Sequence, residues 1–185
     1  MADPCKIRLS TSTPFAATTG LRPYAVTDIQ GHFLLKTAPV GEGNLSASKP
    51  EAGYPDMTNA LYDARNSPSR VTVNAKPGSS PALVTLRFEK PLAVLRWKIV
   101  SASSLTKLEG IYVHIALADD PSIEQYGTSS ADHEFLFVLP ERPIMLVITS
   151  QGFQEWHPSD SPGLSQPLHL PRGTVDQRTI ILKPK

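Results

Sequence analysis

Three aromatic residues in the second half of the chain are the first candidates for ligand chemistry: Tyr126, Phe153 and Trp156. Phe153 and Trp156 lie in the segment Gly152–Pro158, which follows an apolar run, and loops after strands often carry ligand contacts. Aromatic faces pack well on the apolar faces of sugar rings. The three side chains therefore suggest a stacking platform for a carbohydrate. The competing interpretation, which we favour, has Phe153 plugging the end of a β-sandwich and Trp156 covering its core.

A metal site is the second chemistry that the residue types suggest. Tyr112 and His114 are two positions apart, so they share one face if they lie on a strand. Intradiol dioxygenases are enzymes with a β-sandwich fold that bind iron with two tyrosines and two histidines. In this chain, Tyr126, His133 and His157 would have to supply the other ligands. Such residues more often lie at the edge of a core. A metal-dependent enzyme of this type is therefore only a remote alternative.

The remaining catalytic and metal patterns are weak. None of the five histidines has the His-Glu-x-x-His or His-x-x-Glu spacing of a zinc peptidase. Asp119, Asp120, Glu124 and Asp132 offer oxygen ligands for calcium, but their spacing matches no loop that we recognise, and a solvated turn explains them better. No serine stands in a Gly-x-Ser-x-Gly nucleophile setting. We predict no catalytic residues, no metal site and no cofactor.

The bulk properties of the 185-residue chain narrow the range of partners. Eighteen basic and 17 acidic residues give a net charge of +1 without blocks of like charge, so we expect no nucleic-acid partner. No apolar run approaches the roughly 20 residues of a membrane span, and the first residues lack the basic and apolar regions of a signal peptide. The single cysteine, Cys5, is expected to be a free thiol.

Short strands must position these residues, because 18 prolines and 11 glycines disfavour long helices. Apolar and polar residues alternate at period two in several runs, for example at residues 71–73 and 84–88. One short helix is predicted at Met57–Arg65. The predicted strands are Lys6–Ser10, Tyr24–Thr27, His32–Lys36, Gly43–Ser48, Arg70–Asn74, Ala82–Phe88, Ala93–Val100, Tyr112–Leu117, Glu134–Val138, Ile144–Ser150, Leu168–Leu170 and Arg178–Leu182.

A pattern that occurs twice divides these strands into two halves. Each copy holds a tyrosine, a phenylalanine nine positions later, a proline and a Gly-aromatic pair. The offset is 102 at the tyrosines (126 − 24) and 99 at the glycines (152 − 53), as small changes in loop length would produce. We expect two domains, residues 1–90 and 91–185. The copies are Tyr24, Phe33, Pro39 and Gly53-Tyr54, and Tyr126, Phe135, Pro140 and Gly152-Phe153.

The two copies are unequal at the front. Leu95 precedes Tyr126 by 31 positions, whereas Ile7 precedes Tyr24 by only 17. An opening strand–turn–strand element therefore fits the second copy and is shortened or missing in the first. We expect the first domain to be degenerate or, as we slightly favour, the chain to be part of a longer multidomain protein. The fragment Pro91–Lys185 should fold alone.

The second copy resembles the carboxypeptidase regulatory-like domain, a transthyretin-like (prealbumin-like) sandwich of seven strands. His133 stands where the family's usual hairpin glycine is found, and histidine tolerates a left-handed backbone better than β-branched residues do. A second glycine is displaced by Glu141-Arg142-Pro143. The first copy matches more weakly, through Gly31-His-Phe33, Pro39-Val-Gly41 and Gly53-Tyr54. The main matches are Leu108–Val113, Thr128–Phe135, Leu139–Pro143, Leu146–Ile148, Gly152-Phe153 and Thr179–Leu182.

The resemblance implies an accessory module of secreted or envelope proteins in bacteria, with no active-site residues of its own. We therefore predict an all-β chain of two tandem Ig-like or transthyretin-like antiparallel β-sandwiches, the first incomplete. Its expected role is non-catalytic: structural, spacer or protein-binding, in the periplasm, the cell envelope or outside the cell. A carbohydrate-binding module using Trp156 and nearby aromatics is the alternative. The protein or carbohydrate partner is not identified by the sequence.

Overall fold

The computed structural model describes residues 4–11, 24–35, 41–56, 61–62, 69–76, 78, 83–103, 108–128 and 132–185. The chain divides into unit 1, Met1–Lys49 with Tyr54–Glu89, and unit 2, Pro50–Gly53 with Lys90–Lys185. Strands and two short 3-10 helices, η1 (Pro50–Ala52) and η2 (Pro158–Asp160), make up the described secondary structure, which confirms the all-β fold class. The predicted helix Met57–Arg65 lies largely outside the described residues.

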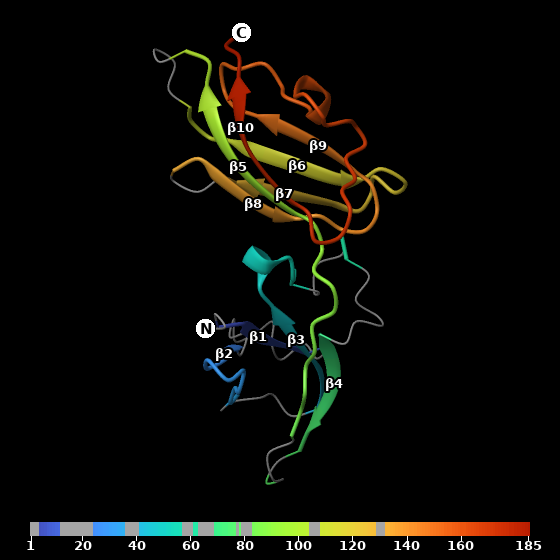
Figure 1. Ribbon diagram of the computed structural model, residues 1–185. Coiled ribbons are helices and arrows are strands. Elements are labelled where there is room, and N and C mark those ends of the chain that lie inside the picture. The colour runs from blue at the N-terminus through green and yellow to red at the C-terminus, as the bar shows by residue number, and fades with distance from the viewer. Residues whose placement is uncertain are drawn as a thin grey trace. The chain divides into compact units, whose positions relative to one another are not determined.

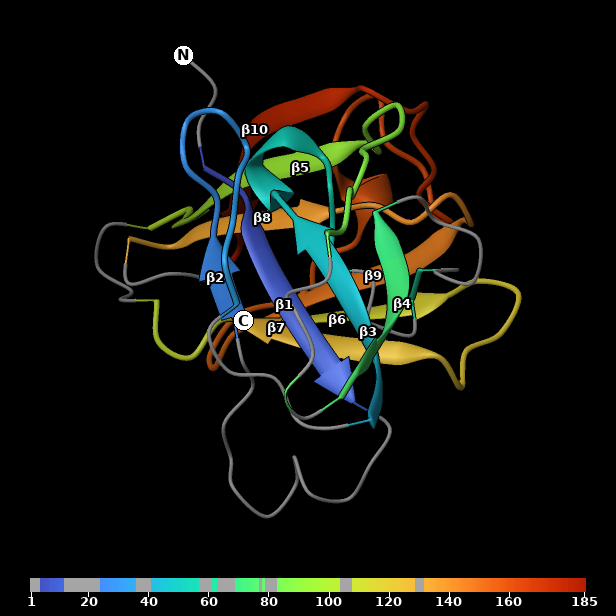
Figure 2. The same ribbon diagram turned by 90° about the horizontal axis from the view of Figure 1, so that it is seen from below.

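Unit 1 contains a four-stranded sheet in the order β2-β1-β3-β4, and every neighbouring pair in it is antiparallel. Figure 2 shows these strands side by side. A turn follows β2, and in it the Asp28 carboxylate accepts hydrogen bonds from the backbone N–H groups of His32 and Gln30. These bonds and the nearby His32 hold the pKa of Asp28 below its ordinary value, against a smaller effect of burial. The strands are β1 (Lys6–Thr11), β2 (Tyr24–Val26), β3 (Gly41–Ser48) and β4 (Arg70–Ala75).

One face of this sheet carries a small apolar core of Ile7, Leu45 and Ala47. Two segments predicted as strands, around residues 32–35 and 83–88, are not strands in the structure. In both segments every second side chain is half-buried and packs on the core. The burial therefore follows the period-two alternation predicted from the sequence. Within the described ranges, neither segment pairs with a strand of the sheet. The packed side chains are Phe33, Leu35, Val84, Leu86 and Phe88.

Unit 2 is a β-sandwich of two three-stranded sheets, ordered β10-β5-β8 and β7-β6-β9. Figure 1 shows them as two layers. Phe135 crosses between the layers: a Cβ placed on Gly127 would lie 3.5 Å from its ring. The strands are β5 (Val94–Ser101), β6 (Tyr112–Leu117), β7 (Glu124–Thr128), β8 (Glu134–Val138), β9 (Ile144–Thr149) and β10 (Val175–Leu182).

The first and last strands of unit 2 differ from the purely antiparallel arrangement that we expected. β5 and β10 pair in parallel over eight residues, from Val94 beside Val175 to Ser101 beside Leu182. The long connection from β9 to β10 makes this direction available, since parallel neighbours require a crossover rather than a tight hairpin. The other strand pairs of this unit are antiparallel.

Two backbone positions of the resemblance have the expected geometry. His133 has a φ of 58°, the left-handed conformation that its place in the hairpin requires. Gly53 and Gly152, which match each other in the repeat, have φ values of 84° and 81°. The two matched glycines therefore share a left-handed backbone conformation, and the tandem repeat itself stays a prediction. The assignment of both units to the carboxypeptidase regulatory-like class stays a prediction.

Candidate binding face of the β7-β6-β9 sheet

The structure separates the three residues of the predicted sugar platform. Phe153 is 1% exposed and Trp156 is 5% exposed, whereas Tyr126 is 66% exposed. Stacking on a ligand requires a free aromatic face, so the expectation that Phe153 and Trp156 offer one is wrong. The burial agrees with the competing interpretation, in which Phe153 plugs the sandwich end and Trp156 covers the core. Only Tyr126 keeps a surface that a ligand can reach.

Trp156 is held in the core by both its backbone and its ring. Its N–H and C=O exchange hydrogen bonds of 3.0 Å with Ile148 at the edge of β9. Its ring meets Trp97 edge-on, with 5.4 Å between the ring centroids and 77° between the planes. Aromatic pairs favour this T-shaped arrangement. The environment of Trp156 is therefore that of a packing residue.

Tyr126 belongs to an aromatic pair on the outer face of the β7-β6-β9 sheet. It lies directly opposite His114 in the ladder, and the two rings stack with centroids 4.6 Å apart and planes 15° apart. The Nε2 atom of His114 lies 2.7 Å from a carboxylate oxygen of Glu124, which orients the imidazole. The stack leaves the Tyr126 ring fixed in position and still open to solvent.

Two further exposed side chains extend this surface. Tyr112 is 56% exposed on the same side of β6 as His114, and its ring lies over Gly110, where an added Cβ would be 3.3 Å away. Met145 is 39% exposed on β9, opposite Ala116 in the ladder. We call Tyr112, His114, Tyr126 and Met145 the tyrosine face. The sequence placed Tyr112 and His114 on one face, but it gave no strand for Tyr126 and so missed the rest.

The five residues considered for an iron site do not converge. Tyr112, His114 and Tyr126 share the tyrosine face, whereas His133 precedes β8 in the opposite sheet and His157 caps η2. Within the described ranges, no three His, Cys, Asp or Glu residues are grouped as metal ligands would be. The geometry offers no basis for assigning iron chemistry to these five residues.

Three of the four acidic residues considered for calcium, Asp119, Asp120 and Glu124, have other partners. Asp119 pairs with Arg142, at 2.7 Å between carboxylate and guanidinium, and this contact lowers the pKa of Asp119. Asp120 accepts a hydrogen bond of 2.6 Å from Ser122, as in a turn. Glu124 faces His114, as described above. These contacts fit the interpretation of a solvated turn.

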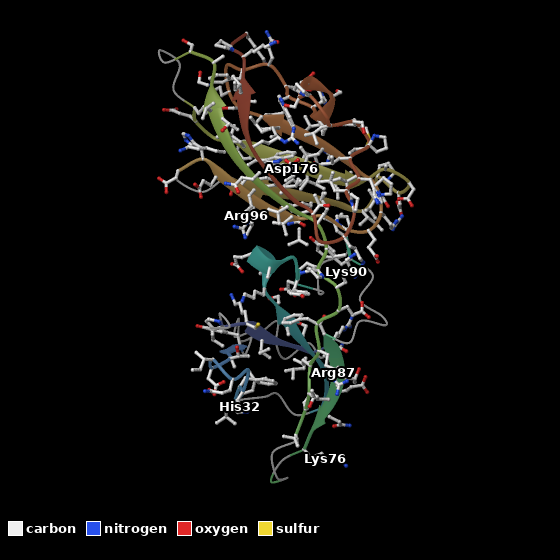
Figure 3. The ribbon with its side chains drawn as sticks, viewed as in Figure 1. His32, Lys76, Arg87, Lys90, Arg96 and Asp176 are labelled. Carbon is white, nitrogen blue, oxygen red and sulfur yellow. The ribbon has the colours of Figure 1, made fainter. Side chains whose placement is uncertain are left out.

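A polar cluster at the edge of the core was not anticipated. The indole N–H of Trp97 donates to Asp176 at 2.7 Å, and Arg178 grips both oxygens of the same carboxylate. Figure 3 labels Asp176 on β10. Burial alone would raise the pKa of Asp176, but the bonds from Arg178 and Trp97 and the guanidinium charge lower it. The spacing of Asp176 and Arg178, two positions apart on a strand, was the signal that could have shown it.

Comparisons with known proteins leave the family of this chain open. No protein-family model matches the sequence, and no curated protein matches it. Among solved structures, the shaft pilin SpaA of Lactobacillus rhamnosus GG is 10% identical with a TM-score of 0.31, covering 100% of this chain and 88% of that one. A minor pilin of Streptococcus agalactiae is 14% identical with a TM-score of 0.32, covering 98% and 82%.

A third structure, the Bacillus anthracis TIE protein, is 15% identical with a TM-score of 0.34; the match covers 98% of this chain but only 31% of that protein. Similarities at these identities and TM-scores assign neither a family nor an activity. Among the described residues, no helix has the length and apolar character needed to cross a membrane.

Proposed function

We propose that this chain is a non-catalytic β-sandwich protein that binds another protein, in the cell envelope or outside the cell. The tyrosine face is the observation that carries the binding role. Tyrosine and methionine are enriched at protein interfaces, where a rigid aromatic ring supplies contact area at a low entropic cost. The envelope location follows only from the resemblance to carboxypeptidase regulatory-like domains.

The geometry favours a protein partner over a sugar on this face. One side of the Tyr126 ring is covered by His114, and Met145 and Val147 continue the surface with aliphatic atoms. A mixed aromatic and aliphatic surface of this kind suits apolar side chains of a partner. A carbohydrate-binding role is the second candidate, and on this face it would have to use Tyr126 and Tyr112 in place of Trp156, because these two rings are exposed and Trp156 is buried.

Site-specific cross-linking tests the proposal. A photo-reactive amino acid at position 126 should give a discrete cross-linked protein in the native cells, and the same group at Gln177, exposed on the opposite sheet, should not. Equal products at both positions, or none at either, would contradict a specific interface. Cell fractionation of the same sample should place the chain in the envelope or in the medium.

Two measurements separate the alternatives. Glycan titration monitored by NMR would favour the sugar-binding role if saturable shifts appear and are lost in Tyr126→Ala but kept in Thr128→Ala, its neighbour on the same strand face. Stoichiometric iron or zinc in elemental analysis of the purified chain would instead favour a metal-dependent enzyme. The proposed role predicts neither result.

A further inference from the structure

The two edges of the β7-β6-β9 sheet have different surroundings. β9 is bonded on both sides: beyond its ladder with β6, Ile144 exchanges two backbone hydrogen bonds with Leu168, and Ile148 exchanges two with Trp156. β7 pairs with β6, and within the described ranges no other segment pairs with it. The outer edge of β7 is therefore the place where this sheet can be extended.

The register of the ladder shows which backbone groups of β7 point to this edge. The N–H of Leu117 donates to the backbone oxygen of Ile123 at 3.1 Å, so Ile123 occupies a hydrogen-bonded position beside β6. Such positions alternate along an antiparallel pair. Every second residue from Ile123 therefore bonds to β6, and the residues between them direct their N–H and C=O groups outward. These outward residues are Glu124, Tyr126 and Thr128.

The side chains of β7 leave its outer edge accessible. Those of Glu124, Tyr126 and Thr128 are exposed, Tyr126 to 66%. The Glu124 carboxylate turns toward His114 on β6, and the Tyr126 ring stacks on the same imidazole, so both side chains lean away from the edge. β7 also contains no proline and no lysine, two residues with which edge strands commonly prevent pairing.

We infer that two copies of this chain pair antiparallel through β7, about a twofold axis at Tyr126. The outward positions 124, 126 and 128 are symmetric about this axis. Tyr126 therefore faces its counterpart, and Glu124 faces Thr128 of the second copy at both ends of the strand. Each facing pair exchanges two backbone hydrogen bonds. The dimer joins the two sheets into one, in the order β9-β6-β7-β7-β6-β9.

β7 is complementary to itself in this register. Facing aromatic residues are a favourable cross-strand pair, and each glutamate lies opposite a threonine. Centring the pair on Glu124 would place two carboxylates directly opposite each other, which is destabilising. Centring it on Thr128 would pair only one outward position of β7 with another. This self-complementarity is the reason for choosing a second copy over a segment of another protein.

The pairing uses the edge of the sheet and leaves the tyrosine face exposed. It goes beyond the binding role proposed above and does not rest on it. The two proposals can be told apart in the cross-linking experiment at position 126. A product with the mass of two chains would report the edge, and a product of another mass would report the tyrosine face.

Sedimentation equilibrium of the full chain tests the pairing, and we expect a monomer–dimer equilibrium. Thr128→Pro removes an outward N–H at a position where an edge strand tolerates proline. It should weaken the dimer at least about tenfold, because two backbone hydrogen bonds are lost. Thr128→Ala keeps the N–H and should change the dimer by less than about threefold. A wild-type chain that stays monomeric up to about 1 mM would overturn the inference.

Charges at position 128 test the register. Thr128→Lys places an ammonium group opposite Glu124 of the second copy and should strengthen the dimer about threefold or more. Thr128→Glu places like charges there and should weaken it by about the same factor. Both effects should shrink at high salt, because the charges are exposed. Equal dimerisation of the two variants would overturn the register.

Hydrogen exchange followed by NMR locates the interface in the wild-type chain. The amides of Glu124, Tyr126 and Thr128 should exchange more slowly as the concentration rises. Those of Gln125 and Gly127 bond to β6, so they should be protected in the monomer as well. Exchange at the outward positions that does not depend on concentration would contradict pairing through β7, even if a dimer forms.

A segment of another protein at this edge is the remaining outcome. Protection of the outward amides that appears only when native cell extract is added would show such a segment. That result would overturn the choice of a second copy.

Discussion

Trp97 connects the packing and the polar contacts of unit 2. Its ring meets Trp156 edge-on and lies 6.4 Å from the ring of Phe135, while its N–H is bonded to Asp176. A side chain with this many partners fixes the positions of all of them.

Removing Trp156 should damage the core and not a binding site. Trp156→Ala is expected to lower the free energy of unfolding by about 3–5 kcal/mol, because it leaves a cavity against Trp97. Tyr126→Ala, on the exposed face, should change it by less than about 0.5 kcal/mol. Urea denaturation followed by circular dichroism measures both. Similar small effects of the two substitutions would contradict the packing role.

The Asp176 carboxylate should make the stability of unit 2 depend on pH. Its pKa is lowered in the folded chain, so its contribution is complete above the ordinary aspartate value of about 4 and is lost as the pH falls through the folded-state value. Asp176→Asn should cost about 1–3 kcal/mol at pH 7, because Arg178 loses its charged partner.

The signature is the difference between the wild-type and Asp176→Asn chains, measured by urea denaturation from pH 7 down to about pH 3. The gap in the free energy of unfolding should close as the pH drops below about 4. A gap that stays constant over this range would show that the ionised carboxylate contributes nothing. Glu141→Gln, at an exposed pair with Arg172, is the matched control and should show little gap at any pH.

His133 carries a backbone strain that glycine would relieve. Its φ of 58° lies in the left-handed region, which costs about 1–2 kcal/mol for a residue with a Cβ. Because glycine also loses more entropy on folding, His133→Gly should stabilise the chain by no more than about 1 kcal/mol. His133→Val should destabilise it by about 1 kcal/mol or more. A higher melting temperature for the His133→Val chain than for the His133→Gly chain would contradict this account.

At the scale of elements, the glycines that match in the predicted repeat, Gly53 and Gly152, have different surroundings. A Cβ on Gly53 would lie 2.5 Å from the backbone oxygen of Leu92 and 2.9 Å from Pro91, whereas a Cβ on Gly152 meets nothing within 4 Å. Gly152→Ala should cost only the left-handed strain, about 1–2 kcal/mol. Gly53→Ala adds a steric clash, so we expect about 2–5 kcal/mol in total. If chemical denaturation shows the same loss in the free energy of unfolding for both substitutions, the backbone at Leu92 moves to accommodate the added Cβ and the clash adds no cost.

Strand positions could be predicted from the sequence where alternation and burial coincide. Residues 112–117 were predicted to the residue as β6, because apolar side chains alternate there between turn signals. β7 was missed, because its sequence, Glu-Gln-Tyr-Gly-Thr, has no apolar run and forms a strand only by pairing with β6. The segment 83–88 shows the opposite case, in which alternation is present but no strand among the described residues pairs with it.

The candidate site could be predicted only in part, because the exposure of its side chains also depends on which strands pair. Residue type suggested Trp156 as a ligand-binding ring, but its burial follows from a bridge to Ile148 that no sequence pattern marks. Tyr126 was among the predicted candidate residues and is exposed, but its stacking on His114 depends on the register of β6 and β7. Exposure is set by pairing between distant segments, and pairing is what a single sequence specifies least.

At the scale of the whole molecule, the two units should differ in autonomy. The fragment Pro91–Lys185 keeps both sheets of the sandwich and is expected to unfold in one cooperative transition. It lacks Pro50–Gly53, whose Gly53 oxygen accepts a hydrogen bond from Leu92, so its transition should lie slightly below that of the same unit in the full chain. Calorimetry of both chains measures this. A fragment without a cooperative transition would contradict the independence of unit 2.

The parallel pairing of β5 and β10 has a mechanical consequence. The Lys90–Lys185 part of unit 2 begins just before β5 and ends just after β10, so a pull on the two ends of this part acts along the length of these paired strands. The hydrogen bonds of the eight-residue ladder would then be loaded together, in shear, instead of being opened one after another. We expect unit 2 to resist tension well, a property suited to a protein held between two anchored partners.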